Sequence, residues 1–496
     1  MSPEVVGALS HGDLVGLVLK LVARVDALEE QNRQLRAENE QLRAEVGRLG
    51  AELGKNSGNS SKPPSRDPAA ERERQAEARR AKRSKGAKRR RPGKQPGTPG
   101  TTLKMVENPD DVVVHEPGAC KDCGEGLSEG DELVGTTRRQ VVDLPEVKPR
   151  YIEHQARSRR CGCCGRVTSA SFPDHVRGPI SFGPRVKAIV AYLLARQHLP
   201  VARAAEAMRD LFGLSISTGA VDGIYAEAGR RLKGFIAALV ALLKSLPVLH
   251  ADETTDRIGT KTCWMHVVST STYTLIHASV SRGWDAVKEV GVLIGYRGVV
   301  VHDRLAMYWK LKAKHQICAA HLLRDLASVA TVASQTVWAE GLARLLVEIN
   351  DACDAARHSG AKALSATVKQ AFNARFDALV AAALAANPEP VGRKRNPLER
   401  DSYNLAVAFS THKRSILRYM HDLRVGPTNN QGERDLRPVK LHRKISSCFK
   451  SQAGAERFAA VRSYLSTTRK NDIPAIEALT RLFNDDPWMP PQPIAA

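Results

Sequence analysis

The chain has 496 residues, enough for several domains of ordinary size. Its 75 Lys and Arg residues outnumber 53 Asp and Glu residues, which gives a formal net charge of +22. A charge this large predicts a polyanionic partner, most simply nucleic acid, rather than a merely solvated basic surface. The apolar stretches are shorter than the roughly 20 residues that cross a bilayer. Because the N-terminus also lacks a secretory pattern, we expect a cytoplasmic protein with no membrane partner.

Residues 1–54 predict a coiled-coil helix. Leucine recurs every seven residues, and a valine, asparagine or leucine follows four residues after each. These d and a positions are Leu14, Leu21, Leu28, Leu35, Leu42 and Leu49, with Val18, Val25, Asn32, Asn39, Val46 and Leu53. Leucine at d with valine and asparagine at a favours a parallel two-stranded coil, so we expect a homodimer or a higher assembly. The alternative is an amphipathic helix that packs on its own domain.

Residues 55–111 predict a disordered basic linker. Its start is polar and rich in proline and glycine, and residues 62–104 hold 15 Lys and Arg against 4 Asp and Glu. Without an apolar face this stretch has no core to fold around, but its cations can neutralise DNA phosphates. The expected DNA contacts are Arg83, Lys85, Lys88, Arg89, Arg90 and Arg91. A role as a solubilising tether is compatible with these contacts.

Residues 112–172 predict a zinc-binding domain. Two C-x-x-C-G motifs occur at 120–124 and 161–165. The glycine of each motif allows a tight turn that points backbone N–H groups at the sulfur atoms. The expected ligands of a structural Zn²⁺ are Cys120, Cys123, Cys161 and Cys164. Cys163 is a spare thiol that could compete with Cys164. Between the two words we expect strands near 137–144 and 149–156. The paired spacing favours metal ligation in a reducing compartment over disulfides.

Residues 173–245 predict a helical region that contains a helix-turn-helix. Residues 201–212 have helical period, Gly213 and Leu214 can form the turn, and Ser217 or Thr218 can cap a second helix. Arg203 and Arg209 are expected to face outward and to contact DNA. The alternative is an ordinary helical hairpin without a role in DNA binding.

From residue 246 the pattern changes to strands alternating with helices. We expect a short strand at 247–251 that delivers Asp252 at its end, and a strand at 298–302 that delivers Asp303. Further strands are expected at 262–270, 273–280 and 315–319, with a helix at 284–293. This order predicts a ribonuclease H-like fold, in which the first and fourth strands lie side by side. The two aspartates would then meet at one edge of the sheet.

Glu433 is the expected third acid. Residues 427–430 form a turn and cap sequence, which puts Glu433 in the first turn of a helix. Three such carboxylates can hold two Mg²⁺ (or Mn²⁺) ions on a phosphodiester, since these hard cations prefer oxygen ligands. Glu253 should point to the opposite face of its strand from Asp252 and play a supporting role. The neighbouring bases expected to hold phosphates are Arg434, Arg437, Arg443 and Lys444. For each acid taken singly, the alternative is a turn or helix cap.

Several sequence motifs of the chain resemble those of the insertion sequence 66 family of acidic-triad (DDE) transposases. The most specific motif is T-N-N-x-x-E-R-x-L-R-P at 428–438. The same family is also resembled by two shorter motifs, H-A-D-E-T at 250–254 and E-R-F-A-A at 456–460. The polar linker at 56–65 also resembles that family. Residues 318–324 resemble its C-W-A-H-x-R-R word, without the tryptophan and one arginine. For His321 both a buried structural role and a role near DNA stay open.

The resemblance implies a DNA transposase in which Asp252, Asp303 and Glu433 are the catalytic residues. Such an enzyme hydrolyses a phosphodiester at a transposon end, and the freed 3′-hydroxyl attacks target DNA. The implied partner is double-stranded DNA, and the implied location is the bacterial nucleoid. Helper proteins are possible further partners. The rival functions are a non-catalytic DNA-binding regulator and a metal-dependent nuclease without strand transfer.

The expected fold class is therefore multidomain α+β. After the N-terminal modules come a catalytic core in two parts, a helical insertion between them, and a C-terminal tail. The expected boundaries are 246–324 and 400–486 for the core, 325–399 for the insertion and 487–496 for the tail.

Overall fold

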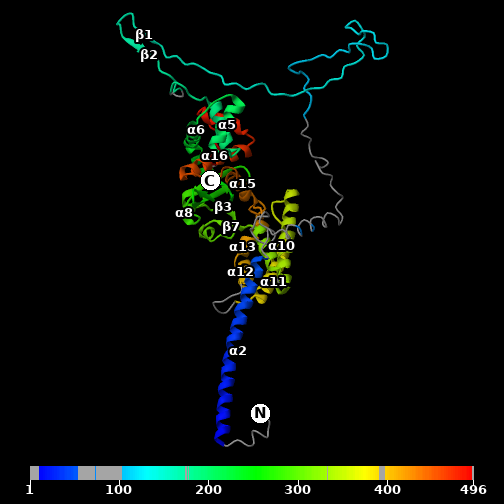
Figure 1. The fold of residues 1–496 in the computed structure, drawn as a ribbon, viewed down its shortest axis with the longest axis vertical. Coiled ribbons are helices and arrows are strands. Elements are labelled where there is room, and N and C mark those ends of the chain that lie inside the picture. Colours follow the sequence, from blue (N-terminus) through cyan, green and yellow to red (C-terminus); the bar gives the residue numbers. More distant parts are fainter. Residues whose placement is uncertain are drawn as a thin grey trace.

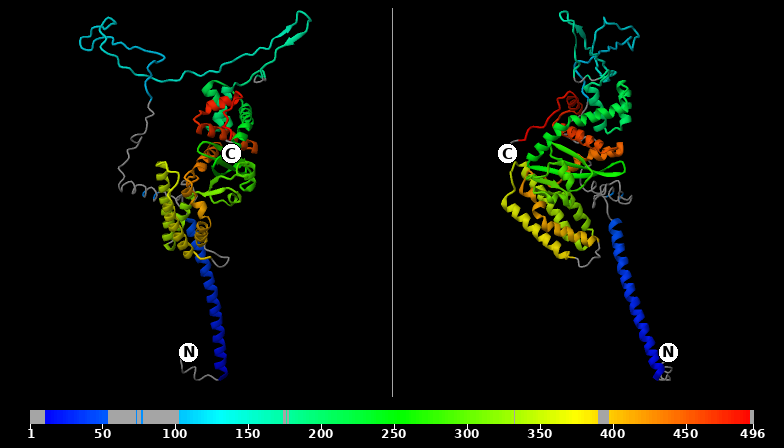
Figure 2. Two further views of the ribbon diagram at one scale, coloured as in Figure 1. Left: turned by 180° about the vertical axis from the view of Figure 1, so that it is seen from behind. Right: turned by 90° about the vertical axis from the view of Figure 1, so that its left-hand side faces the viewer.

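The computed structural model describes most of the chain as a mixed α+β protein. The described residues are 11–53, 73, 77, 103–173, 176, 178–331, 333–389 and 397–493. A long N-terminal helix projects from a body that consists of one five-stranded sheet and its surrounding helices (Figure 1, Figure 2). Every helix in this described part is too short or too polar to span a membrane.

Helix α2 (His11–Leu53) is a single uninterrupted element. Five apolar side chains at its predicted a and d positions are 45% to 57% exposed. They are Val18, Val25, Leu28, Leu35 and Leu42. These five side chains of the predicted seam are therefore open to solvent in the single chain, and pairing of two such helices stays a prediction. The predicted DNA contacts between residues 83 and 91 lie outside the described residues.

Residues 103–157 contain no regular helix or strand, so the strands predicted near 137–144 and 149–156 are wrong. The apolar side chains that suggested them, including Val141 and Tyr151, are almost fully exposed. A strand needs a neighbouring strand and a surface for its apolar face, and this stretch has neither. A small antiparallel hairpin of β1 (Ser158–Arg160) and β2 (Val167–Ser169) forms instead around the second cysteine word.

In the described part of the chain, four helices lie between β2 and the five-stranded sheet. They are α4 (Pro184–Ala195), α5 (Val201–Phe212), α6 (Thr218–Arg231) and α7 (Lys233–Ser245). Helix α5 ends at Gly213, whose φ of 62° is accessible to glycine without strain. Ser217 caps the N-terminus of helix α6, and its hydroxyl accepts a hydrogen bond from the Ala220 N–H at 3.1 Å. The predicted pair of helices, its turn and its cap are therefore present.

The central sheet has the strand order β5-β4-β3-β6-β7. Its strands are β3 (Val248–Ile258), β4 (Lys261–Ser269), β5 (Thr274–Ser279), β6 (Val299–His302) and β7 (Lys314–Ile317). The first three form an antiparallel meander, and β6 and β7 add in parallel. The predicted adjacency of the first and fourth strands is confirmed. Between β5 and β6, helix α8 (Trp284–Val290) ends earlier than predicted, at Gly291 with φ 70°.

A helical section packs against β6 and β7. Its elements are α9 (Ala319–Val329), η3 (Ala333–Gln335), α10 (Thr336–His358), α11 (Ala366–Ala386), α12 (Pro397–Thr411), α13 (Lys413–Ile416) and α14 (Arg418–His421). Their apolar faces form one buried cluster with Val299, Val301 and Ile317 of the sheet. Helix α12 crosses the predicted boundary between residues 399 and 400, because its apolar face packs with α11 and α13 in this cluster.

The C-terminal helices complete the body. They are α15 (Asn430–Ser446), α16 (Gln452–Lys470) and α17 (Ala475–Phe483). Helix α16 covers the edge strand β5, and its buried hydroxyls Ser463 and Thr467 accept the N–H groups of Ile276 and Thr274 at 2.7 and 3.1 Å. These bonds satisfy backbone groups that an open sheet edge would leave unpaired.

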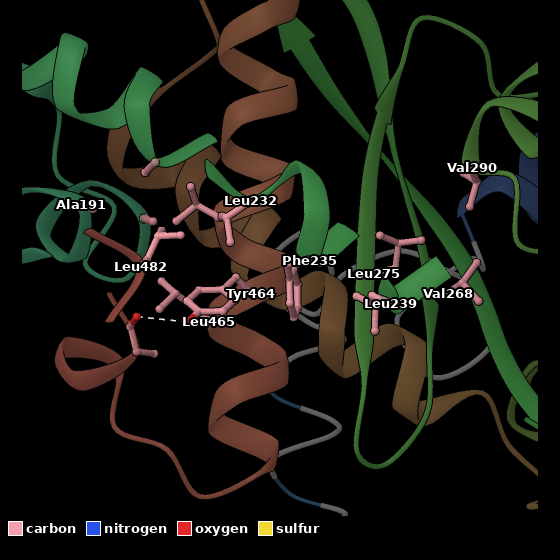
Figure 3. Packing of buried hydrophobic residues seen from close by; sticks show 14 of the residues in the cluster. Ala191, Leu232, Phe235, Leu239, Val268, Leu275, Val290, Tyr464, Leu465 and Leu482 are labelled. Atoms are coloured by element: carbon pink, nitrogen blue, oxygen red, sulfur yellow. Dashed lines mark hydrogen bonds between the residues drawn. The ribbon is translucent and has the colours of Figure 1, made fainter. Parts of the chain in front are cut away.

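One core cluster joins the N-terminal helices to the C-terminal ones. The Phe235 ring of α7 meets the Tyr464 ring of α16 edge-on, with centroids 4.9 Å apart (Figure 3). Leu232, Leu465 and Leu482 surround this pair. The Tyr464 hydroxyl donates to the Ala478 carbonyl at 3.0 Å, so this buried polar group has a partner. The cluster thereby fixes the helical region onto the sheet that carries the predicted acids.

Candidate active site

Asp252 lies inside β3 rather than at its end, which corrects the sequence prediction. Strand β3 pairs with β6 only over Val248–His250, but it continues along β4 as far as Ile258. The strand is longer than predicted because β4 supplies hydrogen-bond partners beyond the apolar run. From Ala251 onward, β3 no longer pairs with β6, so this side of β3 has no neighbouring strand in the described structure. Asp252 therefore stands where the parallel pairing stops.

Asp303 follows the last residue of β6 at the corresponding level. His250 is paired with Val301, so Asp252 and Asp303 each lie two residues beyond this pair on neighbouring parallel strands. The backbone N–H of Leu305 donates to Asp303 Oδ1 at 2.8 Å and holds this carboxylate at the strand end. Parallel neighbours present equivalent residues at the same edge, so the sheet brings the two aspartates together as predicted.

Glu433 reaches the same place from helix α15. The preceding residue, Gly432, is buried against β3, and a Cβ atom there would stand 3.2 Å from the Asp252 Cβ and 3.0 Å from Asn429 Oδ1. The absence of a side chain at Gly432 lets the first turn of α15 approach the strand closely. The third predicted acid thus arrives in the first helical turn, as the sequence predicted.

Asn429 fastens this helix start to the strand. Its side chain is fully buried, its Nδ2 donates to the Ala251 carbonyl at 2.8 Å, and its Oδ1 lies 3.2 Å from His250 Nδ1. Its backbone N–H donates to Cys318 Sγ at 3.1 Å. One residue therefore contacts the strand that carries Asp252 and the start of α9, while it precedes the helix that carries Glu433.

The three acids and Glu253 interact electrostatically. Burial first, and then the charges of Glu253, Asp303 and Glu433, together raise the pKa of Asp252 to about 7, against one backbone hydrogen bond from Glu253 that lowers it. Without a cation, this crowding favours a protonated Asp252 near neutral pH. A divalent cation among the carboxylates would relieve the same repulsion.

Glu253 points away from Asp252, as the alternation of a strand requires. Its side chain is 2% exposed, and its two oxygens accept hydrogen bonds from Arg282 and from the Tyr308 hydroxyl, each at 3.0 Å. Burial, with the charge of Asp303, raises the pKa of Glu253, and the hydrogen bonds from Arg282 and Tyr308 oppose the shift. These contacts fit the predicted supporting role.

Two groups beside Glu433 were not among the predicted site residues. His321 Nε2 lies 4.0 Å and Arg324 Nη2 lies 3.8 Å from Glu433 Oε1. Both side chains come from the first turns of α9, and Cys318 immediately precedes that helix. The C-x-x-H-x-x-R spacing at 318–324 was the signal that could have found them. His321 thus lies beside the third predicted acid.

The described basic residues predicted to bind DNA are exposed, but they lie on two different elements. Helix α15 presents Arg434, Arg437, Arg443 and Lys444, and α5 presents Arg203 and Arg209. In the described part of the chain the four bases of α15 form no ion pair, whereas Arg209 contacts Asp210 at 3.1 Å. The four α15 bases follow Glu433 along the helix that carries this acid in its first turn.

Comparison with protein families agrees with this geometry. The model of the transposase IS66 family matches residues 179–457, more than half of the chain. The chain belongs to the IS66 transposase family. The matched region contains the five-stranded sheet, the helical section and all three acids. A family of unknown function matches residues 20–104, which include most of the predicted coiled coil and the basic linker.

One curated relative is similar to this chain over most of its length. The uncharacterized protein y4hP of Sinorhizobium fredii is 24% identical over 436 residues, which cover 77% of this chain and 76% of that protein. Its name states no activity. The similarity therefore extends well beyond the sheet, without adding information about chemistry.

The zinc-finger binding domain of transposase IS66 matches residues 117–165 of this IS66-family chain, and this match supports a structural zinc ion. Each cysteine word forms a knuckle of the same shape. The Gly124 N–H donates to the Cys120 carbonyl and the Gly165 N–H to the Cys161 carbonyl, both at 2.9 Å. Both glycines have positive φ, 79° and 71°.

The knuckles also prepare their first cysteines as ligands. Backbone N–H groups of the following residues, first those of Cys123 and Cys164, lower the pKa of the Cys120 and Cys161 thiols. Within the described residues, however, no three of the four predicted sulfur ligands lie within 4.8 Å of one another. The structure thus shapes each half of the predicted zinc site without bringing the halves together.

Proposed function

We propose that the IS66-family domain cuts transposon ends and transfers the freed 3′-hydroxyl to target DNA at one Mg²⁺-dependent, DDE-type site. The observation that carries this proposal is the convergence of Asp252, Asp303 and Glu433 from two neighbouring parallel strands and a helix docked through Gly432. The strand order, with helices inserted between the second and third acids, supports a ribonuclease H-like core.

The chemistry of the three acids suits Mg²⁺ or Mn²⁺. All three side chains offer carboxylate oxygens, the hard ligands that these ions prefer. Burial, together with the negative charges of the neighbouring carboxylates, raises the pKa of Asp252 to about 7. Cation binding would turn this repulsion into attraction, at the cost of releasing a proton from Asp252 below neutral pH.

When bound, a pair of such ions would polarise the scissile phosphate and activate the attacking water or hydroxyl. Asp252 and Asp303 would hold the ions from the rigid sheet, while Glu433 would hold them from α15. The exposed Arg434 and Arg437 of the same helix would bind phosphates beside the cut. Because cleavage and transfer both attack a phosphodiester, the same acids can serve both steps in turn.

The other modules would bring the DNA to this site. Arg203 and Arg209 of the helix-turn-helix and the basic linker would bind double-stranded DNA at the nucleoid. Paired α2 helices would hold two transposon ends in one assembly. Helper proteins remain possible further partners.

The decisive experiment compares Asp252→Asn, Asp303→Asn and Glu433→Gln in the full chain. With Mg²⁺ and DNA that contains a transposon end, each variant should cleave at least about a hundredfold more slowly, since even outer-shell partners of a metal typically contribute 10- to 100-fold. Gel shifts should show unchanged DNA binding. Asp285→Asn, an exposed change on α8, is the matched control and should cleave normally.

The outcomes separate the rival functions. A regulator would bind the DNA but would not cleave it even as the unmutated chain. A nuclease would cleave it and give no joined product with target DNA. Normal cleavage by one of the three variants would remove that residue from the triad.

A further inference from the structure

A second group of metal-ligand side chains shares Glu433 with the proposed catalytic triad. Ligand atoms of Cys318, His321 and Glu433 all lie within 4.8 Å of one another. Cys318 immediately precedes α9, and His321 lies three residues later in its first turn, so both side chains occupy one side of that helix start. Glu433 comes from the first turn of α15 and closes the group.

The sulfur atom of this group is already set in place. Cys318 is fully buried, and the backbone N–H of Asn429 donates to its Sγ at 3.1 Å. This is the same kind of N–H···S bond that orients thiolate ligands in metal knuckles. Burial raises the pKa of the Cys318 thiol, while the N–H groups of Asn429, His321 and Ala320 oppose the shift. Metal binding would therefore release a proton from this thiol.

The imidazole of His321 is available as a ligand. Its Nδ1 is buried and, within the described part of the chain, has no hydrogen-bond partner, while its Nε2 stands 4.0 Å from Glu433 Oε1. The side chains of His321 and Glu433 are 26% and 37% exposed, so an ion from solvent can reach these two ligands. Ligand atoms around tetrahedral Zn²⁺ are about 3.5 Å apart, so modest side-chain movement would close the site.

The ligand types decide which ion would bind. A thiolate, an imidazole and one carboxylate match a borderline ion and suit Mg²⁺ poorly. We propose that Cys318, His321 and Glu433 form a second metal site that takes Zn²⁺, with water as the fourth ligand, and that its occupation withholds Glu433 from catalytic Mg²⁺. Zn²⁺ would then inhibit DNA cleavage. The inhibitory part rests on the proposed function of Glu433, whereas binding does not.

Arg324 sets a limit on this site. Its guanidinium lies 3.8 Å from the same Glu433 oxygen, so an incoming cation must displace it or tolerate its charge. We therefore expect a weaker and more readily exchanged ion than in a four-cysteine knuckle pair. Exchange is what a regulatory site requires, because a permanent ion would keep the enzyme inactive.

The first test measures binding without activity. The full chain, with its zinc-finger site filled by one equivalent of Zn²⁺, is titrated with Co²⁺, whose bond to a thiolate gives a charge-transfer absorption band. We expect one further equivalent with this band, which Cys318→Ser should lose and which His321→Gln should shift to at least tenfold higher Co²⁺. Cys353→Ser, a buried thiol on α10, is the matched control and should keep the band. The site is disproved if the unmutated chain lacks the band or Cys318→Ser keeps it.

The second test measures inhibition at fixed Mg²⁺, with each variant normalised to its own cleavage rate when one equivalent of Zn²⁺ fills only the zinc-finger site. Cys318→Ser should need at least tenfold more Zn²⁺ for half-inhibition than the unmutated chain. Equal half-inhibition would overturn the regulatory role. Asp252→Asn should retain the cobalt band, so a metal site would still be found if the proposed catalytic function failed.

Discussion

At the scale of single residues, Asn429 connects parts of the site that lie far apart in sequence. The turn sequence predicted only a cap for the helix that carries Glu433. In the structure its amide bonds the Ala251 carbonyl, and its backbone N–H bonds the sulfur of Cys318. A buried amide with satisfied partners fixes geometry more firmly than an exposed cap can. Asn429 is therefore a positioning residue for Asp252 and Glu433 together.

Asp252 makes the stability of the metal-free protein depend on pH. Its pKa rises from an ordinary 3.8 to about 7 on folding, so between these values the folded state holds a proton that the unfolded state releases. Stability through this group is therefore greatest below pH 4 and is lost as pH rises through 7. Asp252→Asn should raise the stability of the metal-free chain at pH 8 by up to about 4 kcal/mol.

Thermal melting of the full chain without added Mg²⁺ would check this expectation. The gain from Asp252→Asn should shrink steadily between pH 8 and pH 5. Asp285→Asn, whose carboxylate is exposed, should show no such trend. A gain that is equal at both pH values would mean that Asp252 is not the group responsible.

At the scale of elements, neighbouring segments complete what single elements leave unsatisfied. Strand β5 is an edge strand, and α16 supplies hydroxyls to its free backbone groups. The two cysteine knuckles each form by local hydrogen bonds, but each offers only two of the four ligands that a structural zinc needs. A metal ion shared between the knuckles would thus act as the core of the small domain at 117–165.

Zinc should therefore hold this domain together. Cys120→Ser or Cys161→Ser should lose the tightly bound ion and unfold the local domain, because structural zinc contributes folding free energy to small modules. Elemental analysis of the unmutated chain should find about one tightly held zinc, as one four-thiolate site requires. Cys163→Ser, at the spare thiol, should retain it. Full zinc content in both ligand variants would refute the site.

At the scale of the whole molecule, the described a and d side chains of the α2 seam, Val18, Val25, Leu28, Leu35 and Leu42, are exposed, although α2 also contacts α12. We expect two chains to pair along this seam. Leu28→Pro with Leu35→Pro should abolish the pairing, since each proline costs a helix interior about 3 kcal/mol or more. Sedimentation of the full chain should then show monomers, and complexes with two transposon ends should vanish while complexes with one end survive.

Glu30→Ala provides the control for this prediction, because position 30 lies opposite the seam in the same heptad frame. This variant should stay dimeric. A double-proline variant that also remained dimeric would place the assembly interface elsewhere in the chain.

The basic linker should contribute to DNA binding in a separate way. Replacing residues 79–94 with an equally long glycine-serine segment should weaken binding to all DNA sequences alike. Each phosphate contact that is lost should flatten the logarithmic salt dependence by about 0.9. Gel-shift titrations across salt would measure that slope. An unchanged slope would make the linker a tether rather than a DNA contact.

Locally encoded features of this chain could be predicted from sequence. The order of strands and helices, the cap at Ser217 and the three acids each depend on residue type and spacing within a short window. The adjacency of the first and fourth strands could also be predicted from the order of elements, since few topologies accommodate that order. The predicted strands at 137–144 and 149–156 failed because an alternating pattern forms a strand only where a partner exists.

Tertiary structure alone decided the composition of the site. Strand β3 continues past Asp252 because β4 pairs with it, and α15 approaches because Gly432 lacks a side chain. Cys318 and His321 come to lie beside Glu433, more than a hundred residues away, through the docking of α9 and α15 on one sheet edge. Local patterns carry no information about such distant contacts, because packing of the whole core selects them.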